Sequence, residues 1–143
     1  MKKIRLFLAA LMCLLMVPAL SYADGRPIPV EQLPAEAKAF VQNHFPNLKI
    51  IYAEKDGAVF ETRLSNGTEV EFDKKGVWTK VDCNFDAVPD AIVPTSIATQ
   101  VKATFPDAKI NKIEIDRRGY EIELSNDIDM TFSKEGQLIK MDD

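Results

Sequence analysis

Two stretches of this 143-residue chain, 31–83 and 91–143, align with each other at a constant offset of sixty residues and without a gap. About a third of the aligned positions are identical. Self-similarity at a fixed period indicates a duplicated structural unit, so it predicts architecture, whereas activity has to be argued from a site. The identical pairs include Phe45/Phe105, Glu61/Glu121, Phe72/Phe132 and Gly76/Gly136.

The first residues have the pattern of a secretory signal peptide. Lys2, Lys3 and Arg5 form a positive segment, residues 6–20 are apolar except for one proline, and small residues precede a predicted cleavage after Ala23. We therefore expect residues 1–23 to be removed. The processed chain is predicted to be periplasmic or secreted, without a membrane anchor, because the apolar run is short for a bilayer span.

Charge and cysteine content narrow the function classes. Without residues 1–23 the chain carries 15 basic and 22 acidic residues. This balance argues against nucleic acid and anionic membranes as partners, and it suits a cationic partner or a metal ion. Cys83 is the one cysteine left after processing, so no internal disulfide is expected. We expect it to be a half-buried apolar side chain, with a reactive or intermolecular thiol as the alternative.

Each aligned stretch begins with a helix pattern and continues with four strand patterns. Ala37, Val41 and Phe45 lie at spacing four and predict one buried helix face. Residues 60–64 alternate between apolar and charged, and Asn66-Gly67 favours a hairpin. A sheet with one apolar face needs a cover, which the helix supplies.

The predicted fold class is α+β. We expect two tandem repeats of a helix plus a four-stranded antiparallel meander, forming one eight-stranded sheet with both helices on one face. The predicted boundaries are 24–83 for the first repeat, 84–90 for a linker and 91–143 for the second repeat.

Four short motifs occur in both stretches. They are Phe-Pro-(Asn/Asp)-x-Lys-Ile, Glu-x-Asp, (Phe/Tyr)-Glu-x-x-Leu-Ser-Asn and Phe-x-Lys-x-Gly. Together they resemble the PepSY-like family of exported bacterial proteins, also described as β-lactamase-inhibitor-like. The resemblance covers essentially the whole chain after residue 23. It implies tandem helix-plus-four-strand repeats, with an open sheet face that binds proteins in some relatives, and it brings no catalytic or binding residues.

No enzyme motif is recognisable. His44 is the only histidine, and a catalytic or metal-binding role would need partners for it. The chain contains no Gly-x-Ser-x-Gly, no glycine-rich phosphate loop and no Cys-x-x-Cys. We therefore predict that the protein is not an enzyme and has no cofactor.

Clustered acidic residues raise the question of calcium. Asp127 and Asp129 lie near a predicted hairpin, and Asp142 and Asp143 lie at the end of the last predicted strand. Calcium prefers several oxygens on one suitable loop, and no Asp-x-Asp-x-Asp-Gly run is present. We predict no dedicated metal site, and weak calcium binding stays the alternative to an ordinary exposed acidic strand.

The exposed face of the sheet is the predicted binding surface. The alternation that points Val81 inward points Trp78, Lys80 and Asp82 outward, and an aromatic residue within a charged rim is typical of a binding patch. In the alternative interpretation, Trp78 folds over the sheet edge and packs on its own turn. The predicted partner-binding residues are Trp78, Lys80, Asp82, Glu61, Arg63, Leu138 and Lys140.

Two functions of different classes follow. The first is an exported, non-enzymatic interaction module that binds an unknown protein or peptide through the open sheet face and inhibits or regulates it. The second is a calcium- or small-ligand-responsive periplasmic protein.

Overall fold

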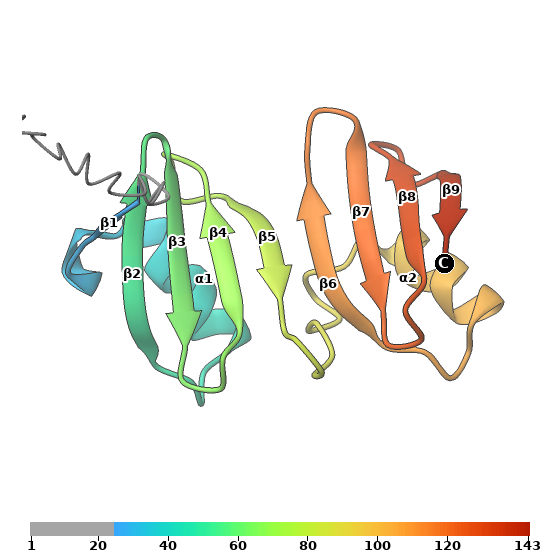
Figure 1. The fold of residues 1–143 in the computed structure, drawn as a ribbon, viewed down its shortest axis with the longest axis horizontal. Helices are drawn as coiled ribbons and strands as arrows, with labels where there is room; N and C mark the ends of the chain where they lie inside the picture. The colour runs from blue at the N-terminus through green and yellow to red at the C-terminus, as the bar shows by residue number, and fades with distance from the viewer. Residues whose placement is uncertain (1–24) are drawn as a thin grey trace, which may run out of the picture.

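The computed structural model describes residues 25–143, which form one antiparallel sheet with two α-helices on one of its faces (Figure 1). The nine strands pair in sequence order, each antiparallel to the next. In chain order the elements are β1 (Arg26–Pro27), the 3₁₀ helix η1 (Val30–Gln32), α1 (Ala35–His44), β2 (Ile50–Asp56), β3 (Val59–Leu64), β4 (Glu69–Phe72), β5 (Trp78–Asp82), α2 (Thr95–Thr104), β6 (Ile110–Ile115), β7 (Gly119–Leu124), β8 (Asp129–Ser133) and β9 (Leu138–Asp142).

The helices bury the apolar side of the sheet. Ala37 and Val41 of α1, and Ile97 and Val101 of α2, belong to the same core cluster as the inward-facing strand residues. Figure 1 shows both helices behind the sheet, so no helix of residues 25–143 lies over the opposite face. The largest fully buried side chains are Phe72, Phe132, Leu64, Ile97, Ile113, Ile122, Leu124 and Met130.

The predicted architecture of two tandem helix-plus-four-strand repeats in an eight-stranded sheet is wrong. Residues 25–143 form one nine-stranded sheet, because Arg26 and Pro27 pair with Lys55 and Glu54 and add β1 beside β2. A two-residue strand containing a proline has no alternation, so the sequence could not predict it. β5 and β6, on either side of residues 84–90, pair directly and make the sheet continuous.

The predicted signal peptide and its cleavage after Ala23 lie outside the described residues. Within residues 25–143 no helix is long and apolar enough to cross a membrane. The two α-helices have ten residues each, a length of about 15 Å at the usual helical rise.

Candidate functional site

The sheet face opposite the helices, which we call the open face, carries two rows of mostly charged side chains. Side chains alternate between the two faces along each strand, so residues that pair on neighbouring strands form a row across the sheet. The first row is Glu54, Glu61, Glu71, Lys80, Glu114, Glu121, Thr131 and Lys140. The second row is Tyr52, Arg63, Glu69, Asp82, Lys112, Glu123, Asp129 and Asp142.

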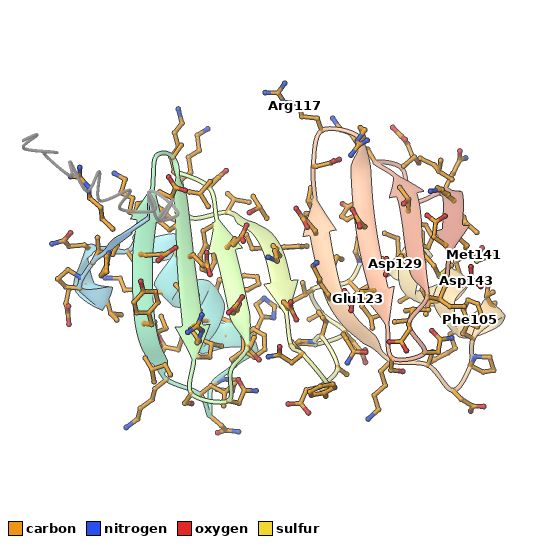
Figure 2. All side chains as sticks on the ribbon, in the orientation of Figure 1. Phe105, Arg117, Glu123, Asp129, Met141 and Asp143 are labelled. Carbon is orange, nitrogen blue, oxygen red and sulfur yellow. The ribbon has the colours of Figure 1, made fainter. Side chains whose placement is uncertain are left out.

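The open face is strongly acidic. Its two rows hold ten carboxylates and four basic groups, an excess of six negative charges. Figure 2 looks onto this face, where Glu123 and Asp129 are labelled on neighbouring strands. An excess of one sign on one face attracts oppositely charged ligands and raises their rate of encounter.

Ion pairs neutralise part of this charge. Arg63 Nη2 lies 3.0 Å from Glu69 Oε1, and Lys80 Nζ lies 3.1 Å from Glu71 Oε1. Exposed pairs of this kind contribute at most about 1 kcal/mol each. Within residues 25–143 the open-face carboxylates with no ion-pair partner are Glu54, Glu61, Asp82, Glu114, Glu121 and Asp129.

Glu61 is at the centre of the most crowded part of the first row. It pairs with Glu54 on one side and with Glu71 on the other. Partial burial, followed by repulsion from Glu54, Glu69 and Glu71, raises the pKa of the Glu61 carboxyl, and Lys80 acts in the opposite direction. Like charges held side by side destabilise the free protein, and a bound cationic group would relieve that repulsion.

Replacing Glu61 by glutamine is expected to raise the melting temperature at pH 7 and to leave it unchanged near pH 3. The folded-state pKa of this acid is raised, so its charged form is penalised in the fold. That penalty exists above the folded-state pKa and vanishes below the unfolded value. Thermal melts at both pH values check this, with Glu135→Gln in an exposed turn as control. A melting temperature that falls at pH 7 would contradict the repulsion.

The structure brings five of the seven sequence-predicted residues onto the open face. Glu61, Arg63, Lys80 and Asp82 lie together on β3 and β5, and Lys140 lies on β9, four strands from Lys80. Lys140 Nζ lies 2.6 Å from the Asp142 carboxylate. Trp78 and Leu138 do not join this group.

The expected outward position of Trp78 is wrong because of a β-bulge. Glu71 pairs with Lys80, but Phe72 pairs with Trp78, so Thr79 is an extra residue in β5. The bulge returns Trp78 to the helix-covered face, where its ring centroid lies 6.3 Å from that of Phe40 on α1. The side chain of Trp78 is therefore half-buried and packs against the hydrophobic core.

An equivalent β-bulge in β9 explains why Leu138 is not on the open face. Phe132 pairs with Leu138 and Thr131 pairs with Lys140, so Ile139 is the extra residue in β9. Leu138 thus lies on the helix-covered face at the edge of the sheet, where 36% of its surface is exposed. Its predicted place beside the charged residues of the open face is wrong for the same reason.

Several open-face residues are absent from the prediction. They come mostly from β2, β6 and β7, and β6 and β7 join the first half of the sheet only through the pairing of β5 with β6. The available signal was the alternation of polar and apolar residues in β2 and its counterpart sixty residues later. Open-face residues outside the predicted binding set include Tyr52, Glu54, Lys112, Glu114, Glu121, Glu123 and Asp129.

The remaining candidates lie away from the open face. Cys83 is buried rather than half-buried, with 3% of its surface exposed, and burial raises the pKa of its thiol to about 11. His44 ends α1 with its ring centroid 4.5 Å from that of Phe40. A pocket of about 460 Å³ between α2 and the preceding loop contains none of the predicted residues. Within residues 25–143 no group of three or more acidic, histidine or cysteine side chains is arranged to hold a metal ion.

Comparison with known proteins places the chain among periplasmic proteins. Residues 22–69 and 58–140 match a family described as "putative beta-lactamase-inhibitor-like, PepSY-like". A putative periplasmic protein from Bacteroides vulgatus is 40% identical, with a TM-score of 0.80 over 84% of this chain and 98% of that one. A second protein from Bacteroides vulgatus, described as periplasmic and of unknown function, is 32% identical, with a TM-score of 0.79 over 83% and 99% of the two chains.

A further solved structure carries a more specific description. It is a putative calcium-regulated periplasmic protein from Bacteroides thetaiotaomicron, 41% identical, with a TM-score of 0.79 over 84% of this chain and 98% of that one. No curated protein matches the chain at a significant level.

Residues 25–143 are built on a single antiparallel sheet whose two α-helices lie on one face, and the similar proteins are described as periplasmic. The chain belongs to the PepSY-like family. The predicted resemblance is therefore confirmed, and so is the periplasmic location, because the similar proteins are described as periplasmic. The position of cleavage near Ala23 stays a prediction.

Proposed function

We propose that this protein is a non-enzymatic interaction module of the periplasm that binds a cationic segment of a protein or peptide through the open face. The observation that carries the proposal is the asymmetry of the sheet. The helices lie over one face only, and the other face presents ten carboxylates against four basic groups.

The shape of the open face favours a macromolecular ligand over a single ion. The first row crosses eight strands, from Glu54 to Lys140, a distance of about 34 Å at the usual strand spacing. An extended segment of about ten residues spans the same length. The carboxylates lie in rows rather than in one oxygen cage, so each can pair with a separate cation along the segment. The inhibitor-like description of the family supports a protein partner.

The test compares two double variants with the same change in net charge. Glu61→Lys with Glu121→Lys reverses two charges on the open face, whereas Glu31→Lys with Glu135→Lys reverses two exposed charges in η1 and a turn. The probe is a fluorescent ten-residue peptide of alternating lysine and alanine, followed by anisotropy at about 0.15 M salt, where the Debye length is about 8 Å. Weakening of at least about tenfold is expected for the open-face variant, because local charge dominates a screened interaction.

The control variant is expected to change the peptide affinity by less than about threefold, because neither Glu31 nor Glu135 belongs to the two rows of the open face and salt screens charges outside the contact. An equal loss in both variants would mean that only the net charge of the protein matters, and the open face would then be excluded as a site. Capture of partners from periplasmic extract with the same two variants extends the test to the natural ligand.

Calcium responsiveness is the second candidate, favoured by the description of the 41% identical relative. Six open-face carboxylates without an ion-pair partner in residues 25–143 could attract the ion. A ligand that prefers the folded state raises the melting temperature. The test measures the melting temperature with millimolar calcium, and with magnesium as the control. A shift for calcium alone supports it, and equal or absent shifts contradict it.

A further inference from the structure

Within residues 25–143, β9 is an edge strand of the sheet with no strand paired to its outer side. All five of its residues are exposed. Three of them are large and apolar: Leu138, Ile139 and Met141 are 36%, 62% and 47% exposed. Natural proteins usually avoid an exposed apolar edge strand, because its unpaired backbone groups can pair with another chain. The opposite edge is shorter, since β1 has two residues and one is a proline without an amide hydrogen.

β5, sixty residues before β9, is the equivalent strand of the first aligned stretch and has the same charged residues, a lysine and an aspartate on either side of an apolar residue. Its outer edge pairs with β6, and Val81 and Ile113 are fully buried at the junction. Each charged residue of β5 is opposite a residue of the other sign. The three pairs of the ladder are Lys80–Glu114, Val81–Ile113 and Asp82–Lys112.

β9 carries Lys140, Met141 and Asp142 where β5 carries Lys80, Val81 and Asp82. This order is self-complementary in an antiparallel pair. If two β9 strands pair about Met141, each Lys140 is opposite Asp142 of the partner subunit, and the two Met141 side chains are opposite each other. The charge pattern of the β5–β6 ladder is then reproduced by two identical strands.

We propose that two copies of this chain pair through β9, antiparallel about Met141, and join their sheets into one. A two-fold interface of this kind uses the same surface on both subunits and closes after two copies. The proposal concerns the sheet edge and is independent of what the open face binds.

The backbone direction of β9 agrees with this register. Directly after β5, the amide of Cys83 donates to the carbonyl of Asn111 on β6 at 2.9 Å. Amide directions alternate along a strand, so the amide of Val81 faces β6 as well. Met141 has the position in β9 that Val81 has in β5, since they pair with Met130 and Val70. Its N–H and C=O groups therefore face the free edge. Two Met141 residues on the two-fold axis can exchange both hydrogen bonds.

Charge-swap variants test the pairing by sedimentation equilibrium of protein purified from the periplasm. Concentrations from about 10 µM to about 1 mM cover the dissociation constants of weak dimers. Lys140→Asp alone and Asp142→Lys alone each place like charges opposite each other across the two-fold axis. Each is expected to raise the dimer dissociation constant about tenfold. The double variant restores opposite charges and is expected to recover the original constant. Lys134→Asp, in the turn before β9, is the control.

Cross-linking gives a second readout that does not depend on affinity. In a hydrogen-bonded antiparallel pair the two Cα atoms are about 5.5 Å apart, a separation that a disulfide can bridge. Met141→Cys is expected to form a covalent dimer under mild oxidation, whereas Lys134→Cys is not. Cys83 is buried and does not compete.

A protein that stays monomeric at every concentration would overturn the proposal. A double variant whose dimer dissociation constant is as high as that of the single variants would overturn it as well. Assemblies larger than two would mean that β9 pairs with a different strand of the next copy, and they would overturn the two-fold arrangement.

Discussion

Replacing Phe72 by alanine is expected to lower the free energy of unfolding by about 3–5 kcal/mol, the range for truncating a buried phenylalanine. Phe72 has no exposed surface and lies opposite Phe60 in the sheet. Its ring packs edge-to-face on Phe40 of α1, with centroids 5.7 Å apart. The substitution therefore removes one of the large side chains that join α1 to the centre of β3, β4 and β5.

The chain supplies its own control for this measurement. Phe85 is 95% exposed, so Phe85→Ala removes the same atoms without leaving a cavity and is expected to change stability by less than about 0.5 kcal/mol. Urea denaturation of both variants gives the two free energies. Similar values for Phe72→Ala and Phe85→Ala would contradict a core centred under the helices.

Gly119→Ala is expected to destabilise the protein by about 2–6 kcal/mol, the sum of backbone strain and overpacking. Gly119 begins β7 with a φ of +150°, which side chains rarely adopt. A Cβ at this position would overlap the carbonyl oxygen of Phe132 on β8, which is backbone and cannot rotate away. The pairing of β7 with β8 would have to open at that point.

Gly57→Ala separates these two causes. Gly57 also has a positive φ, +56°, but a Cβ there meets no atom within 4 Å. Its replacement is expected to destabilise by about 1–2 kcal/mol through strain alone. Unfolding curves of the two alanine variants that agree within 0.5 kcal/mol would show that the approach of β8 to Gly119 is not close.

The sequence predicted local elements better than their assembly. Helical spacing from Ala37 to Phe45 corresponds to α1, which begins at Ala35 and ends at His44. The alternation in residues 60–64 corresponds to β3. These signals are strong because burial repeats with the period of the element. β1 was not predictable, because two residues give no period and its pairing with β2 depends on tertiary contact.

The candidate site was predictable in its chemistry and only partly in its residues. Charged residues on alternate positions of β3 and β5 identified a polar face. The bulges at Thr79 and Ile139 have no local signature, since neither residue is a glycine, and they moved Trp78 and Leu138 to the other face. A one-residue shift reverses every side chain beyond it, so a pattern of period two cannot be extended through a bulge.

The most direct test of the proposed function is a map of where a cationic ligand binds. In this measurement the amide signals of isotope-labelled protein are followed by NMR during titration with the alternating lysine–alanine peptide. Binding through the open face predicts the largest shifts at the charged residues of β3, β4, β6 and β7, among them Glu61, Glu71, Glu114 and Glu121. Shifts confined to α1, α2 and the loops beside them, or no shifts at saturating peptide, would contradict it.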